Sequence, residues 1–145
     1  MNNLKIKRIN KELKECQNNN FKINLIDDDI TKWILFFDGP SDTPYENFNF
    51  KLSIIFPIDY PFSPPDIRFL SKIFHPNISL DSIICLDILK YNWSPVLSMY
   101  KVIISLISLL SDPNTKSPLN DHAAKLYNSD IDLYNKTIIE FLSDD

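Results

Sequence analysis

Glycine is almost absent from this sequence: of 145 residues, one is glycine, Gly39. The phosphate-binding loops of P-loop proteins and of dinucleotide-binding folds each need several glycines, because the backbone must approach the phosphates closely. Neither motif can be written anywhere in the chain. Nucleotide binding through such a loop is therefore excluded.

Cysteine is also scarce, with two residues, Cys16 and Cys85, far apart in the sequence. There is no apolar segment typical of a secretory signal and no apolar run long enough to span a bilayer. The sequence thus indicates a reducing compartment, free thiols rather than a disulfide framework, and no membrane contact.

An excess of positive charge is missing as well. Lysine and arginine number 15 against 19 acidic residues, which gives a net charge of -4 and argues against a broad nucleic-acid surface. The charge is nevertheless segregated: residues 1–20 carry five basic and two acidic side chains, whereas the remainder carries ten and 17. The hydrophobic fraction is 44%, so we expect a globular protein, with residues 1–145 forming a single domain. The basic N-terminal segment is either a solvated helix face or a docking surface for an acidic partner, and the segregation of charge favours the docking surface.

All ten prolines lie between Pro40 and Pro118, which leaves both ends of the chain free for helices. Helical spacing of apolar residues predicts helices over residues 4–16, 99–110, 122–128 and 131–142. Short apolar runs predict strands over residues 21–26, 32–37, 49–56 and 66–69, with an acidic turn at 27–29. Short links favour a four-stranded antiparallel meander, and residues 71–98 form an irregular stretch of the kind that often carries function. Together these elements predict an α+β fold.

Two of the predicted helices have informative faces. In the first, we expect Leu4, Ile6, Ile9, Leu13 and Cys16 to be buried and the basic residues, Lys5 included, to face water mostly on the other side. In the central helix, the expected buried stripe is Val102, Ile103, Leu106, Leu109 and Leu110. Ile104 falls on the opposite, polar face of that helix and is expected to be exposed.

Few residues here can support covalent chemistry, and most lie in or near the irregular stretch: His75, Asn77, Cys85, Asp87, Ser117 and His122. A zinc site would need the two cysteines and two histidines, but no two of them have the close spacing of metal ligands, so no metal is expected. A thiol hydrolase would pair Cys85 with His75 or His122 as general base. A buried, inert Cys85 is a third interpretation, because residues 83–86 are apolar.

A longer pattern favours a fourth interpretation. His75-Pro76-Asn77 is followed by residues 84–89 (ICLDIL), then by Trp93-Ser94-Pro95, Asp112-Pro113-Asn114 and Pro118-Leu119. Earlier in the chain stand residues 60–65 (YPFSPP) and 7–13 (KRINKEL). This series resembles the ubiquitin-conjugating enzymes, in family order and over nearly the whole chain. The ICLDIL and WSP blocks resemble most the subgroup that carries ubiquitin itself and works with RING-type ligases.

The resemblance implies a two-step carrier. Cys85 would accept the carboxyl terminus of ubiquitin as a thioester from the activating enzyme and pass it to a substrate lysine. ATP would be used upstream, so no cofactor is expected. Asn77 would stabilise the oxyanion or support the loop that does so, and Asp87 and Ser117 would shape the lysine approach. His75 and Asn114 would support the same loop.

The resemblance also implies partner surfaces. The expected contacts with the activating enzyme and RING-type ligases are Lys7, Arg8, Lys11, Phe62, Pro95 and Val96. Ile104 is expected to contact the donor ubiquitin. The expected partners are thus ubiquitin, the activating enzyme, ligases and protein substrates, with no nucleic acid and no membrane. We expect a monomer, located in the cytoplasm with the nucleus as a second compartment.

Two other functions stay open at this point: a non-catalytic ubiquitin-binding scaffold of the same fold, and the Cys/His thiol hydrolase. The sequence also departs from the family pattern just before Cys85. There, Leu80, Asp81 and Ser82 replace a loop that usually contains glycine.

Overall fold

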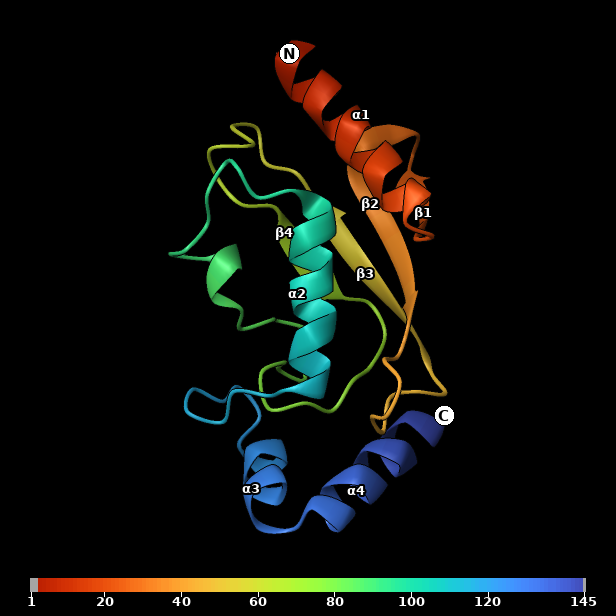
Figure 1. Cartoon of the computed structure of the whole chain (residues 1–145), viewed down its shortest axis with the longest axis vertical. Helices are drawn as coiled ribbons and strands as arrows, with labels where there is room; N and C mark the ends of the chain where they lie inside the picture. Colours follow the sequence, from red (N-terminus) through yellow and green to blue (C-terminus); the bar gives the residue numbers. More distant parts are fainter. Residues whose placement is uncertain (1–2, 145) are drawn as a thin grey trace.

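The computed structural model describes residues 3–144, which form an α+β fold of four α-helices and one sheet (Figure 1). The elements follow in the order α1 (Asn3–Asn18), β1 (Lys22–Ile26), β2 (Asp29–Asp38), β3 (Asn49–Ile55), β4 (Asp66–Phe69), the short 3-10 helix η1 (Asp87–Leu89), α2 (Met99–Ser111), α3 (Asp121–Ser129) and α4 (Ile131–Ser143). The order and type of the predicted helices and strands are confirmed. No helix within residues 3–144 is both long and apolar enough to cross a membrane.

The sheet is a four-stranded antiparallel meander in the order β1-β2-β3-β4. Side chains alternate along β2 and β3, so one face of the sheet is buried and carries Trp33, Leu35, Phe37, Phe50, Leu52 and Ile54. In Figure 1, α2 lies across one face of the sheet, α1 lies beside β1 and β2, and α3 and α4 lie at the opposite end. The core therefore forms between the sheet and α2.

The central helix matches its predicted pattern. Its buried residues are Met99, Val102, Ile103, Leu106 and Leu110, while Leu109 is half-buried. Ile104 is 39% exposed, as expected from its place on the polar face. The helix begins after Ser98, whose side-chain oxygen accepts a hydrogen bond from the Lys101 backbone N–H at 3.2 Å.

The first helix follows its predicted pattern in part: Ile9 and Cys16 are buried, and Ile6 and Leu13 are half-buried. Its buried line runs through Lys5, Ile9, Glu12 and Cys16, whereas Leu4 is 74% exposed. Lys5 lies with its stem along the protein, and its Nζ donates a hydrogen bond to the Ile58 carbonyl at 3.2 Å. Long side chains with a polar tip can cover apolar surface, so hydropathy alone assigned Leu4 and Lys5 to the wrong faces.

The acidic turn is shorter than predicted. Asp27 and Asp28 both have positive φ, 54° and 58°, which is the conformation of a two-residue hairpin turn. Asp29 already belongs to β2, and its carboxylate accepts hydrogen bonds from the Thr31 backbone N–H and hydroxyl. Aspartate tolerates left-handed backbone better than most residues, so the hairpin closes without glycine and β2 starts at residue 29 rather than 32.

The chain's one glycine occupies a place of close backbone approach. A Cβ added to Gly39 would lie 1.8 Å from the Tyr45 carbonyl oxygen, and Gly39 does not have positive φ. The left-handed positions among the described residues are all held by other residue types: Asn20, Asp27, Asp28, Asp42 and Ser82. Glycine is thus required here for space, because the loop between β2 and β3 folds back on itself.

Candidate active site

The His75-Pro76-Asn77 corner lies at the start of the irregular stretch and is fully packed. His75 is 0% exposed, its Nδ1 accepts a hydrogen bond from the Asn77 backbone N–H at 3.0 Å, and its Nε2 lies 2.8 Å from the Leu109 carbonyl oxygen. These contacts assign the proton to Nε2. Burial lowers the pKa of His75 to about 4. The ring is therefore neutral near pH 7 with both nitrogens engaged, and it is not available as a general base.

Asn77 ties two loops together. Its side chain is paired with the backbone of Asn114 in both directions: Nδ2 donates to the Asn114 carbonyl at 2.6 Å, and Oδ1 accepts from the Asn114 N–H at 2.8 Å. The carbonyl of the preceding Pro76 accepts from the N–H groups of Leu119 and Asn120, at 2.8 and 3.1 Å. Residues 112–120 are thus fastened to the His75-Pro76-Asn77 corner. An asparagine amide has two N–H donors, so one remains for a further acceptor.

The two cysteines have different surroundings. Cys85 is half-buried, and its backbone N–H donates to the Asn77 carbonyl at 2.8 Å, which places the cysteine beside the corner. Cys16 is 0% exposed on α1, and burial, with smaller contributions from Glu12 and Glu15, raises the pKa of its thiol to about 12. A thiol with such a pKa stays protonated and poorly nucleophilic near pH 7, so Cys16 is a packing residue. Reactivity can be expected of Cys85 alone.

Asp87 and Ser117 are both exposed but come from different loops. Asp87 begins η1, and its Oδ2 accepts a hydrogen bond from the Asn92 side chain at 3.0 Å. Ser117 lies in the loop that is fastened to the corner. One residue, Leu86, separates Asp87 from Cys85, whereas Ser117 is linked to the thiol's segment only through the contacts of its loop with Pro76 and Asn77.

His122, the other candidate base, lies in the first turn of α3. It is exposed, and its ring packs edge-on against Phe74 with centroids 5.6 Å apart. Within residues 3–144 there is no cluster of three or more histidine, cysteine or acidic side chains that could hold a metal ion.

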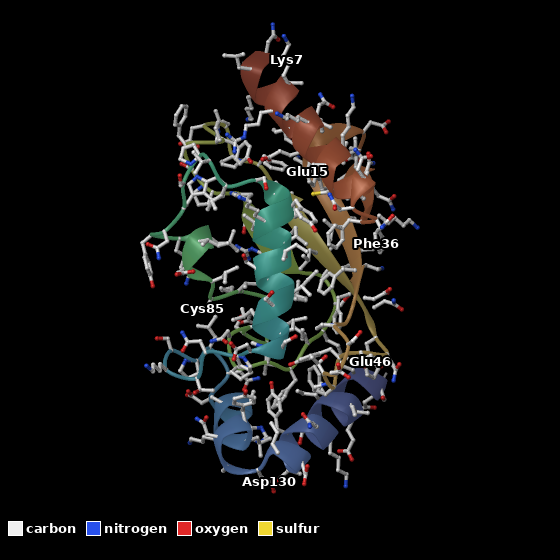
Figure 2. All side chains as sticks on the ribbon, in the orientation of Figure 1. Lys7, Glu15, Phe36, Glu46, Cys85 and Asp130 are labelled. Atoms are coloured by element: carbon white, nitrogen blue, oxygen red, sulfur yellow. The ribbon has the colours of Figure 1, made fainter. Side chains whose placement is uncertain are left out.

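Lys7, one of the predicted docking residues, lies apart from the thiol. Figure 2 shows Lys7 at one end of the molecule and Cys85 well away from it, beside the lower half of α2. Lys7 and Lys11 are exposed on α1, and Phe62 and Val96 are 77% and 86% exposed on two loops. Between α1 and the second loop, which carries Pro95, lies a hollow of about 620 Å³.

Arg8 has a different environment from the exposed lysines. Its Nη2 donates to the Leu97 carbonyl at 3.0 Å and lies 3.5 Å from Glu12 Oε1, and its guanidinium stacks over the Tyr60 ring at 5.4 Å. Sequence reasoning missed Glu12, which is buried and accepts a hydrogen bond from the Tyr60 hydroxyl. The available signal was an acidic residue one turn from Arg8 in an otherwise basic helix.

Residues 6–142 match the sequence profile of the family described as ubiquitin-conjugating enzyme. The chain belongs to the ubiquitin-conjugating enzyme family. Among solved structures it is similar to the E2 domain of a ubiquitin conjugating enzyme from Toxoplasma gondii, with 38% identity and a TM-score of 0.87, over 94% of this chain and 95% of that one.

This member of the ubiquitin-conjugating enzyme family closes the turn before Cys85 without glycine. Ser82 adopts a left-handed conformation with φ 77°, and its N–H donates to the Ser79 carbonyl at 3.0 Å. The Ser79 hydroxyl in turn accepts from the Ile83 N–H at 2.9 Å. Side-chain and backbone hydrogen bonds of Ser79 thus hold a turn that glycine would form without steric strain.

Proposed function

We propose that this member of the family is a ubiquitin carrier with Cys85 as the acceptor. The Cys85 sulfur attacks the thioester carbonyl that joins ubiquitin to the activating enzyme, a new S–C bond forms, and the activating enzyme's thiol leaves. A substrate lysine amine then attacks, a C–N bond forms, and Cys85 leaves as a thiol. The observation that carries the proposal is the half-buried Cys85 fastened to the Asn77 carbonyl, beside a fully packed corner.

Carrier chemistry suits this site better than hydrolysis. Exchange between two thioesters is close to thermoneutral, so the protein must position the reactants more than drive the reaction. A hydrolase would need a base beside Cys85, and His75 is neutral with both ring nitrogens engaged. With His75 unavailable as a base, we expect slow reaction with water and a thioester that survives until an amine arrives.

Transfer to lysine makes two demands on the site. The attacking amine must be neutral, and with a pKa near 10.4 only about 0.04% is deprotonated at pH 7, a deficit of roughly 4.6 kcal/mol. We assign to Asp87 and Ser117 the shaping of the lysine approach. The oxyanion needs a donor, and the second N–H of Asn77 is our candidate; losing one such donor raises a barrier by about 2.7 to 4 kcal/mol. The pairing with Asn114 supports the loop-holding role at the same time.

The proposed carrier acts with several proteins: ubiquitin, the activating enzyme, RING-type ligases and protein substrates. It works as a monomer in the cytoplasm and nucleus and takes no cofactor of its own, since ATP is consumed by the activating enzyme. Lys7, Lys11, Phe62 and Val96 support this assignment, because they expose basic side chains on α1 and apolar side chains on the two loops at residues 57–65 and 93–98.

A loading assay tests the proposal. The chain is incubated with activating enzyme, ATP and ubiquitin, and the products are separated without reductant. We expect an adduct that dithiothreitol releases, that is lost in Cys85→Ala and that is kept in Cys16→Ala, the matched control. No adduct with the wild-type chain would support the scaffold, and release of free ubiquitin without accumulation would support the hydrolase.

A further inference from the structure

Three large apolar side chains stand out on the partner-facing end of the molecule. Ile58, Phe62 and Val96 are 94%, 77% and 86% exposed. They belong to residues 57–65 and 93–98, two loops without helix or strand. A mobile loop must be ordered when a partner binds, and that ordering opposes binding. Contacts that hold these loops before binding would therefore favour association.

Glu12 makes contacts with three separate segments. Its Oε2 accepts from the Tyr60 hydroxyl in the first loop, and its Oε1 accepts from the backbone N–H of Met99, the first residue of α2, at 3.4 Å. The same Oε1 lies 3.5 Å from Arg8 Nη2, one turn away on α1. Glu12 is 5% exposed, so its carboxylate bridges α1, the first loop and the start of α2 out of contact with water.

Arg8 contacts the second of the two loops, residues 93–98. Its Nη2 donates to the carbonyl of Leu97, and its guanidinium lies over the Tyr60 ring. The two loops are also joined directly, because the Trp93 indole N–H donates to the Pro61 carbonyl at 2.9 Å. We call Arg8, Glu12 and Tyr60 the α1 clamp.

A buried carboxylate contributes little net stability to a core, because its charged form loses the solvation that water gives it. Burial raises the pKa of Glu12, the usual sign that its charged form is poorly solvated there. Apolar residues of similar volume are often as stabilising as a buried ion pair, and the best-attested use of such pairs is to fix one arrangement of neighbouring elements. The α1 clamp has the form of such a device, since each member touches a segment that carries a predicted partner contact.

We propose that Glu12 and Tyr60 are positioning residues that hold residues 57–65 and 93–98 against α1 as one composite docking surface. Loss of the α1 clamp weakens engagement of the activating enzyme and leaves the chemistry at Cys85 unchanged. The inference rests on the proposed carrier function.

The decisive variant is Tyr60→Phe, which keeps the ring and removes the hydroxyl that Glu12 accepts from. The probe is an activating enzyme that loads the wild-type chain, with loading rates measured against the concentration of the chain. We expect KM to rise about fivefold to tenfold, as for the loss of one typical hydrogen bond, while kcat changes by less than about twofold. Discharge of the purified thioester to free lysine, without ligase, is expected to keep its rate.

Tyr45→Phe is the matched control. Tyr45 is also buried, and its hydroxyl donates to the Phe74 carbonyl at 2.6 Å, but it lies in the loop between β2 and β3, outside the α1 clamp. We expect this variant to lose stability and keep the wild-type KM. An equal rise of KM in both variants would mean general destabilisation and would overturn the inference.

A double variant of Glu12 and Tyr60 tests whether the two residues act on KM together or independently. Glu12→Gln is also expected to raise KM, and the double variant is expected to raise it by less than the product of the two single effects, because both substitutions weaken the contact between Glu12 and Tyr60. An unchanged KM in Tyr60→Phe, with normal loading of the wild-type chain, would overturn the α1 clamp and leave the carrier function standing. If no activating enzyme loads Cys85 of the wild-type chain, the carrier function itself fails.

Discussion

His75 illustrates how burial decides what a residue can do. Sequence spacing offered it as a base for Cys85, but the ring is fully enclosed, with Nδ1 accepting from Asn77 and Nε2 donating to Leu109. Its value to the protein is structural: it fixes the corner from which the Cys85 backbone is held. A charged imidazolium would lose the hydrogen bond from the Asn77 N–H, since both of its nitrogens are then donors.

The lowered pKa of His75 makes the stability of the fold depend on pH. Between its unfolded pKa near 6.5 and its folded pKa of about 4, the unfolded chain takes up a proton that the folded chain does not. Stability from this group is fully present above the unfolded value and falls as the pH drops through this window, by about 3 kcal/mol in total. Urea denaturation between about pH 7 and pH 4 measures the loss.

The control for this pH dependence is His75→Gln. The variant is expected to be less stable at neutral pH but to lose less stability on acidification. Glu12, whose pKa is raised by burial, acts in the opposite sense, so only the difference between the two proteins isolates the histidine. Equal slopes in the two proteins would rule out His75 as the source.

The exposure of single side chains was predicted correctly where it follows from helix periodicity. The burial of charged side chains was not predicted. Ile104 was expected to be exposed and is. Lys5 and Glu12 are buried although hydropathy favours water for both, because their polar atoms find partners in a distant loop, at Ile58 and Tyr60. Tertiary packing determines such partners, and no local sequence pattern predicts them.

At the scale of elements, α2 connects the two ends of the molecule. Its buried stripe packs in the core, its first N–H contacts Glu12, and the carbonyl of Leu109 near its end accepts from His75. The helix thus touches both the docking end and the corner beside Cys85. Its exposed face is free for a partner, and Ile104 is the apolar residue on it that we assign to the donor ubiquitin.

Ile104→Asp tests that assignment. A charged side chain at an apolar contact is left desolvated when ubiquitin folds back on α2, so we expect RING-stimulated transfer to slow by at least about tenfold. Thioester loading should be unchanged, because Ile104 is exposed and its replacement leaves the core intact. Ile104→Val is expected to retain transfer.

Ile139→Asp makes the same change on another helix. Ile139 is 46% exposed on α4, which lies at the end of the molecule opposite α1. We expect it to load and transfer normally. Transfer at the wild-type rate in Ile104→Asp, or an equal slowing in Ile139→Asp, would remove the special role of α2.

The helices and strands were predictable because the hydrophobic periodicity and the positions of the prolines indicate the same elements. Alternation in β2 and β3 and the 3.6-residue spacing in α2 each specify one structure. The start of β2 was misplaced because Asp27 and Asp28 take on the left-handed turn that glycine usually supplies. The packing of residues 71–98 could not be derived from local pattern, since its hydrogen bonds reach to residues 109, 114 and 119.

At the scale of the whole molecule, charge is unevenly distributed along the chain. The net charge of -4 averages a basic segment of residues 1–20 with an acidic remainder. Lys7 and Lys11 are exposed on α1, whereas Arg8 is engaged by Glu12 and Leu97. Long-range attraction of an acidic partner therefore depends on the two lysines more than on the arginine.

Salt dependence tests this division of charge. Raising NaCl from about 50 to about 300 mM is expected to increase KM for the activating enzyme several-fold, because exposed charges are screened within a Debye length. A Lys7→Ala/Lys11→Ala variant should start from a higher KM and respond less to salt. Lys125→Ala/Lys136→Ala, the same loss of charge on α3 and α4, should behave as wild type. A wild-type KM that is insensitive to salt would contradict electrostatic docking.

Gly39 has a consequence for how this sequence can change over time. Left-handed backbone is supplied by Asn20, Asp27, Asp28, Asp42 and Ser82, so those five sites remain open to several residue types, glycine among them. Gly39 has no such alternatives, because any Cβ there meets the Tyr45 carbonyl. Glycine is thus replaceable at the left-handed positions and is needed at Gly39 for space. Gly39 therefore marks a position where mutational tolerance should be near zero, far from both the thiol and the α1 clamp in sequence.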